Sequence, residues 1–291
     1  KFNNIRFNSK NCKPNDIFFA IKGNNSNGNY FIKKAIRNGS KIIISNLNFE
    51  GFNKEKILFI KSKNPRKALA EAANNFYIKK PKNIIALTGT NGKTSIANFF
   101  YQLLYLNKKK VATIGTLGVL SKRIKFKTSN TTIDSIKIHQ ILQKLKNLKI
   151  DNVIVEASSH GLKQYRLDEI NFKTALFTNL TRDHLDYHKT FKDYLSSKLI
   201  LFDRLLVNKG NIIFENGIPQ EKELQKISKK KKLKIHKIGC ENSFINLKKI
   251  QKINDKKRVS FSLLKKDYSF YSHLIGSIQI KNLLFAVLAA Y

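Results

Sequence analysis

The segment Thr88-Gly89-Thr90-Asn91-Gly92-Lys93-Thr94 constrains the fold of this chain more than any other. An apolar run at 84–88 leads into it, and apolar side chains at helical spacing follow across 93–107. A glycine-rich turn between a strand and a helix lets backbone N–H groups converge on phosphate oxygens at the helix N-terminus. Lys93 is then placed to reach terminal phosphates, and the Thr94 hydroxyl to bind magnesium. The segment predicts an ATP-binding phosphate loop in an α/β domain.

The loop is a variant of the common form, which has glycine at the position of Leu87; here the first glycine is Gly89. A chance glycine-rich turn is the alternative interpretation. The strand before the loop and the helix after it argue against chance, because the phosphate-binding motif requires both.

Two segments of different organisation are predicted, 1–82 and 83–291. The first is a small α/β domain with strands at 17–21, 41–45 and 57–60 and helices at 31–38 and 64–77. The polar segment Lys79-Lys80-Pro81-Lys82 is typical of a hinge. The second has strands at 84–88, 111–113, 153–157 and 175–178, and helices at 93–107, 135–148 and 191–206. This alternation predicts a mostly parallel sheet flanked by helices. Mixed strands are expected over 207–275, and a last helix from Asn282.

Composition narrows the classes of function. The chain is 42% hydrophobic, so it can build cores, and its net charge is +37. Lysine is spread along the chain, and the tight runs at 108–110 and 229–232 resemble solvated helix ends or loops, so we expect no nucleic-acid partner. No apolar run of about 18 residues or export signal is present, so we expect no membrane partner and a cytoplasmic location. Cys12 and Cys240 form no metal-binding spacing.

Polar residues follow two predicted strands, where ligands of open α/β sheets bind. Glu156 ends the first strand and offers carboxylate oxygens that suit magnesium, although a strand-end capping cluster is the alternative. The following Ser159-His160 pair lacks the Gly-x-Ser-x-Gly elbow of a hydrolase. The second strand leads into the segment 177–188, whose histidines, His184 and His188, lack the zinc pattern His-Glu-x-x-His.

Lys198 lies within the apolar stripe of the predicted helix 191–206. Such a lysine usually extends its charged end to solvent. The alternative is a lysine that points toward the site with altered chemistry.

Together these segments resemble the Mur ligases, most closely the members that add the third amino acid to UDP-N-acetylmuramoyl-dipeptide. The resemblance extends from about Ile5 to Tyr291. It rests on the loop at 88–94, on Glu156–Leu162 followed by Gln164 and Arg166, and on Phe177–His188.

The resemblance implies roles for individual residues. ATP would be bound by Gly89, Thr90, Asn91, Gly92, Lys93, Thr94, Ser95 and Asn179. Catalysis would depend on Lys93, Glu156, His184 and Lys198. Two magnesium ions would be held, one by Thr94 and Glu156, the other by His184 and a carbamylated Lys198. The UDP-muramoyl-dipeptide would be bound by Ser9, Asn24, Asn25, Ser26, Thr131, Thr132, Ser158, Gln164 and Arg166.

The chain departs from the family pattern at Lys10, where arginine is usual, and at Gln279, where asparagine is usual. The family's C-terminal amino-acid-binding domain is not in this sequence, so we expect residues 1–291 to bind substrates without completing ligation.

The implied reaction is ATP-dependent amide formation between the muramoyl-dipeptide and a diamino acid, through an acyl phosphate, by a monomer. The sequence does not distinguish meso-diaminopimelate from lysine. A catalytically incomplete nucleotide-binding fragment and a folylpolyglutamate synthase-like ligase are the alternatives. The segments at Ser9 and 24–26 resemble UDP-contacting segments and argue against the second.

Overall fold

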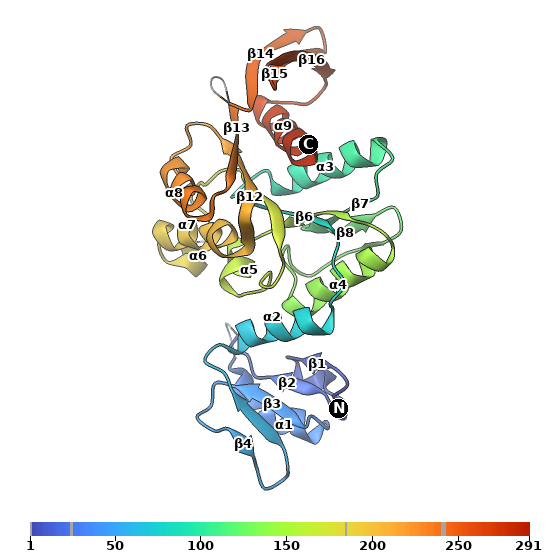
Figure 1. Cartoon of the computed structure of the whole chain (residues 1–291), viewed down its shortest axis with the longest axis vertical. Helices are drawn as coiled ribbons and strands as arrows, with labels where there is room; N and C mark the ends of the chain where they lie inside the picture. Colours follow the sequence, from blue (N-terminus) through green and yellow to red (C-terminus); the bar gives the residue numbers. More distant parts are fainter. Residues whose placement is uncertain (1, 24–25, 184, 240–242) are drawn as a thin grey trace. The chain divides into compact units, whose positions relative to one another are not determined.

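The computed structural model describes residues 2–23, 26–183, 185–239 and 243–291. Asn24, Asn25 and His184, three of the predicted site residues, lie outside these ranges. The chain divides into two compact units (Figure 1): a first unit of 1–80, 134–143 and 164–169, and a second unit of 81–133, 144–163 and 170–291. Two short segments that follow the phosphate loop in sequence therefore belong to the first unit.

The first unit contains a sheet with the strand order β1-β2-β3-β5-β4, in which only β4 runs antiparallel to its neighbour. Side chains alternate between its faces, because successive strand residues point to opposite sides. Phe18 and Ile43 pack with helix α1, while Phe19 packs with α2. The elements are β1 (Ile5–Arg6), η1 (Ser9–Asn11), β2 (Ile17–Phe19), η2 (Gly28–Phe31), α1 (Ile32–Arg37), β3 (Ile42–Ser45), β4 (Gly51–Phe52), β5 (Leu58–Lys61) and α2 (Pro65–Phe76).

The second unit is built on one long mixed sheet, ordered β16-β15-β14-β13-β12-β11-β6-β10-β7-β8-β9 within the described residues. Its strands from β14 to β7 are parallel, and both edges are antiparallel. The strands are β6 (Asn83–Thr88), β7 (Val111–Gly115), β8 (Gly118–Ser121), β9 (Lys125–Phe126), β10 (Asn152–Glu156), β11 (Phe172–Phe177), β12 (Leu206–Glu215), β13 (Lys234–Gly239), β14 (Ile245–Ile253), β15 (Lys256–Leu263) and β16 (Lys266–Ser272).

Helices cover both faces of this sheet. Phe100 of α3 and Leu284 of α9 join Leu87 of β6 in one buried cluster, while Phe202 packs on Phe177 of β11 from the opposite face (Figure 1). The helices are α3 (Lys93–Leu106), α4 (Ser135–Asn147), α5 (Ser159–Lys163), α6 (Leu185–His188), α7 (Phe191–Ile200), a π-helical turn η3 (Leu201–Leu205), α8 (Glu221–Lys231) and α9 (Ser277–Ala290). The predicted α/β class with a mostly parallel central sheet is confirmed. None of the helices in the described ranges is long and apolar enough to cross a bilayer.

The structure differs from the sequence-based element assignment in three places. The region 207–275 also contains α8, whose apolar stripe is too sparse to detect because Leu224 is its one buried large apolar residue. The last helix begins at Ser277, directly after Gly276 at φ 78°, rather than at Asn282. The helix predicted to run to 206 ends at Ile200, and the turn after it delivers the chain into β12.

Candidate functional site

The phosphate loop joins the end of β6 to the start of α3 and depends on its two glycines. Gly89 has φ 149° and Gly92 has φ 87°, a region that L side chains rarely adopt. A Cβ on Gly89 would lie 1.8 Å from Thr178 Oγ1, and one on Gly92 would lie 2.7 Å from Asn282 Oδ1. Glycine is therefore required here by close packing as well as by backbone conformation.

The end of β11 holds this loop in place. Thr178 Oγ1 donates to the Asn91 carbonyl at 2.7 Å, and Asn91 N–H donates to Asn179 Oδ1 at 2.9 Å. Both side chains of the Thr178-Asn179 pair thus contact Asn91. Their predicted position at a strand end is where the structure places them, and the contacts give Asn179 a loop-positioning role.

Two lysines converge on one loop carbonyl. Lys93 Nζ donates to the carbonyls of Gly89 and Thr90, both at 2.8 Å, and Lys198 Nζ donates to the Gly89 carbonyl at 2.8 Å. Burial lowers the pKa of the Lys93 ammonium, while Glu156 and Asp183 oppose that shift. Two lysine N–H donors beside one loop suit a polyanionic ligand.

Lys198 points inward rather than to solvent. It is only 2% exposed, and its Nζ lies 4.4 Å from the centre of the Tyr194 ring. Tyr194 was not identified from the sequence; its hydroxyl lies 3.2 Å from Thr90 Oγ1, so it links α7 to the loop. Burial and, to a lesser extent, the Lys93 charge lower the pKa of Lys198 from its ordinary 10.5 to about 7, against an opposing influence of Asp183.

This pKa predicts a pH-dependent stability. Because the folded-state pKa of Lys198 lies below the unfolded one, the unfolded chain binds the extra proton between pH 7 and pH 10.5, so stability rises with pH in that window. Lys198→Met removes the group. In bicarbonate-free buffer, the free energy of unfolding of the wild type, measured with urea, should rise by about 2 kcal/mol relative to that of this variant between pH 7 and pH 9.

Lys192→Met, an exposed position on the same helix, is the matched control and should follow the wild-type pH dependence. A difference in unfolding free energy between wild type and Lys198→Met that does not change with pH would contradict the lowered pKa of Lys198.

Glu156 is a buried carboxylate at the end of β10, 2% exposed. Oε2 accepts from Thr94 Oγ1 at 3.0 Å and from Thr116 Oγ1 at 3.1 Å, and Oε1 accepts from Thr116 N–H at 3.1 Å. Within the described ranges it makes no ion pair. Thr116 was missed in the sequence because the predicted strand ended at 113, whereas β7 extends to Gly115 and Thr116 directly follows it.

Lys93, Thr94, Thr116 and Lys198 line a cavity of about 250 Å³, here called the phosphate-loop cavity. Thr131, Ser158 and Lys198 line the same cavity as the phosphate loop. The lining residues are Thr90, Asn91, Gly92, Lys93, Thr94, Ser95, Thr116, Thr131, Ser158, Ser159, Tyr194 and Lys198.

Thr132 has a different setting. It is 2% exposed, its Oγ1 donates to the Glu156 carbonyl at 2.9 Å, and it accepts from Ser158 N–H at 2.8 Å. The hydroxyl thus fixes the backbone that carries Glu156 and Ser158.

The remaining predicted substrate residues belong to the first unit. Ser9 is buried, and its carbonyl accepts from Asn38 Nδ2 at 2.8 Å. Arg166 Nη2 donates to Gln164 Oε1 at 2.8 Å, so these two side chains form a pair. Ser26 is exposed, and its carbonyl accepts from Gly23 N–H.

Two family descriptions match this chain: the Mur ligase middle domain over residues 87–290, and the Mur ligase family catalytic domain over residues 1–77. The first covers more than half of the chain. The chain therefore belongs to the Mur ligase family.

Among its relatives, the UDP-N-acetylmuramoyl-L-alanyl-D-glutamate–2,6-diaminopimelate ligase of Rickettsia montanensis is 38% identical over 100% of this chain and 61% of the relative. The protein of that name from Clostridium tetani is 42% identical over 76% of this chain and 46% of the relative. The chain thus spans about three fifths of the length of the first relative.

Solved structures share the fold. A structure of a UDP-N-acetylmuramoyl-L-alanyl-D-glutamate–2,6-diaminopimelate ligase matches with a TM-score of 0.85 at 24% identity, over 99% of this chain and 59% of the other. The MurF ligase of Thermotoga maritima in complex with ADP matches with a TM-score of 0.61 at 19% identity, over 98% and 62%. An FPGS–AMPPCP complex matches with 0.62 at 12% identity, over 77% and 62%.

Proposed function

We propose that the whole protein is an ATP-dependent ligase that joins a diamino acid to the D-glutamate carboxylate of UDP-N-acetylmuramoyl-L-alanyl-D-glutamate. The observation that carries this proposal is the phosphate-loop cavity, whose lining includes Lys93, Ser158 and Thr94, and the Thr94 hydroxyl donates to the buried carboxylate of Glu156. The relatives named for this reaction are 38% and 42% identical to the chain.

The proposed reaction has two steps. A carboxylate oxygen attacks the γ-phosphorus of ATP, ADP leaves, and an acyl phosphate remains. The amine then attacks the acyl carbon and loses a proton, and phosphate departs with the former carboxylate oxygen. To contact the phosphates, the Lys93 ammonium exchanges its bonds with the Gly89 and Thr90 carbonyls for phosphate oxygens. Catalysis here is chiefly charge neutralisation and positioning.

Thr94 and Glu156 fit a magnesium ion. Glu156 is a buried carboxylate whose contacts are a pair of hydroxyls and one amide, with no cation bonded to it in the described residues. No group of three or more His, Cys, Asp or Glu side chains gathers within those ranges, so hydroxyl, water and nucleotide oxygens would complete the coordination. Magnesium, when bound, withdraws charge from the phosphate oxygens.

We propose that Lys198, once carbamylated, binds a second magnesium ion together with His184. A pKa of about 7 leaves much of the Lys198 amine neutral at physiological pH. The neutral nitrogen can add to the carbon of CO2 and release a proton, which gives an anionic oxygen ligand. Carbon-13 NMR in labelled bicarbonate should show a carbamate signal in the wild type that Lys198→Met lacks. A wild-type spectrum without this signal would contradict carbamylation of Lys198.

By the family resemblance, we propose that nine residues contribute to binding of the UDP-dipeptide. They are Ser9, Asn24, Asn25, Ser26, Thr131, Thr132, Ser158, Gln164 and Arg166.

The test is an assay of phosphate release by the full-length protein with ATP and magnesium. Release should require both the UDP-dipeptide and a diamino acid, and mass spectrometry should find the tripeptide product. Parallel assays with meso-diaminopimelate and lysine decide the amino acid. Release with a folate substrate instead, or with no acceptor at all, would overturn the proposal.

A further inference from the structure

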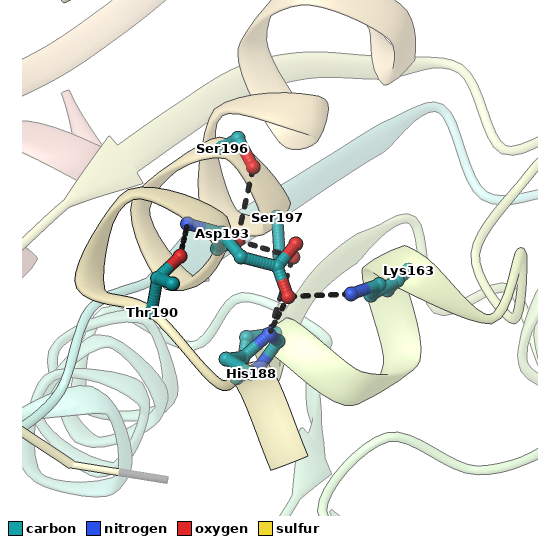
Figure 2. Close-up of polar contacts among 7 residues, drawn as sticks. Lys163, His188, Thr190, Asp193, Ser196 and Ser197 are labelled. Atoms are coloured by element: carbon teal, nitrogen blue, oxygen red, sulfur yellow. Dashed lines mark hydrogen bonds and ion pairs between the residues drawn. The ribbon is translucent and has the colours of Figure 1, made fainter. Parts of the chain in front are cut away.

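A chain of polar side chains leads from the protein surface to the phosphate-loop cavity. Figure 2 shows its outer part, where Asp193 Oδ2 lies 2.6 Å from Lys163 Nζ and 3.5 Å from His188 Nδ1. On the other side of the imidazole, His188 Nε2 lies 2.8 Å from Ser159 Oγ. Ser159 lines the cavity, and none of the proposed roles above involves Ser159, His188 or Asp193.

The neighbours of His188 assign its proton to Nδ1. The Ser197 hydroxyl donates its one hydrogen to the Asp193 carbonyl at 2.7 Å, so at 3.4 Å from Nδ1 it can only accept. The Asp193 carboxylate is also an acceptor. Nδ1 therefore carries the hydrogen. His188 is fully buried, and burial is the largest of the influences that together lower its pKa, which favours the neutral imidazole.

A neutral His188 with the proton on Nδ1 has a bare Nε2. Ser159 must then donate its hydroxyl hydrogen to Nε2, which leaves the Ser159 oxygen as an acceptor only. Ser159 therefore presents a hydrogen-bond acceptor to the cavity, whereas Lys93 and Lys198, which line the same cavity, are hydrogen-bond donors.

An acceptor has no partner among the anionic groups of the proposed reaction, because phosphate and carboxylate oxygens cannot donate a hydrogen bond. The incoming amine carries N–H hydrogens and can. We propose that Ser159 Oγ accepts a hydrogen bond from the amine of the incoming amino acid, and that His188 and Asp193 are positioning residues that fix the polarity of this hydroxyl. The inference rests on the ligase function proposed above.

Kinetics of the two half-reactions test the inference in the full-length protein. Formation of acyl phosphate needs no amine and can be followed by rapid quench as a burst of ADP without amino acid. Ser159→Ala should keep the burst rate and the ATP affinity within about twofold. Its kcat/KM for the amino acid should fall about 10- to 100-fold, as for loss of one hydrogen bond to a polar or charged group.

Three companion variants make the result specific. Ser159→Thr keeps the hydroxyl and should restore most of the amine step. Asp193→Asn offers an N–H to Nδ1, which favours the other tautomer, and should lower the same parameter while sparing the burst. Ser196→Ala is the matched control and should behave as wild type, since the exposed Ser196 hydroxyl hydrogen-bonds only to the Asp193 carbonyl among the described residues.

The inference would be overturned if Ser159→Ala kept the wild-type kcat/KM for the amino acid. It would also be overturned if the rate of the ADP burst fell in parallel with kcat/KM. Failure of the proposed function looks different, because the wild-type protein itself would then show no ADP burst with the UDP-dipeptide.

Discussion

Lys93→Ala is expected to lower the affinity for ATP–magnesium by at least about 100-fold, measured by calorimetry. Lys93 is a half-buried cation of the loop, and its carbonyl contacts hold the ammonium beside Gly89 and Thr90. Removing one partner of a desolvated charge pair costs about 3–5 kcal/mol, and about 1.4 kcal/mol is tenfold in affinity.

Lys192→Ala serves as the control, because it removes an equal charge from the exposed face of α7. It should bind ATP as wild type does. Equal affinity of wild type and Lys93→Ala would show that the loop does not hold the phosphates.

Glu156→Gln is expected to lower kcat by about 100- to 1,000-fold, the range seen when one preorganised electrostatic group is lost from an active site. The amide keeps the size of the side chain, but it lacks the negative charge that a magnesium ion requires beside Thr94. The measurement is ATP turnover by the full-length protein across a magnesium titration.

Higher magnesium should recover part of the activity of Glu156→Gln, because the variant would weaken the proposed metal site. The control is Glu223→Gln on the exposed face of α8, which should match wild type at every magnesium concentration. A Glu156→Gln protein with wild-type turnover and magnesium dependence would exclude Glu156 from the metal site.

The sequence predicted the parts of the site that depend on local order. The phosphate loop could be identified because strand, glycines, Lys93 and helix follow one another directly. Glu156 and Asn179 could be placed because polar residues at the carboxyl ends of parallel strands lie at the same edge of a sheet. The same rule applies to Thr116, but the predicted strand stopped at 113 and so missed that β7 reaches Gly115.

Contacts between segments that are distant in the sequence could not be predicted from it. Ser159 and His188 are 29 residues apart, and each looks like an ordinary polar residue by itself. The packing of Asn282 against Gly92 depends on how α9 lies beside α3, which no local pattern encodes. Likewise, 134–143 and 164–169 join the first unit through contacts that periodicity does not report.

The inward orientation of Lys198 was one of two interpretations that the sequence allowed, since a lysine in an apolar stripe can also extend to solvent. The structure decides for the buried position, with the Tyr194 ring on one side and the Gly89 carbonyl as acceptor. Its carbamylation and its part in metal binding stay predictions.

The most direct test of the central claim follows an oxygen atom through the reaction. The full-length protein is given ATP, magnesium, a diamino acid and UDP-dipeptide with oxygen-18 in the D-glutamate carboxylate that becomes the amide. Activation through an acyl phosphate transfers one labelled oxygen to the released inorganic phosphate, which mass spectrometry detects. Phosphate without the label, in a reaction that yields the tripeptide, would contradict the account.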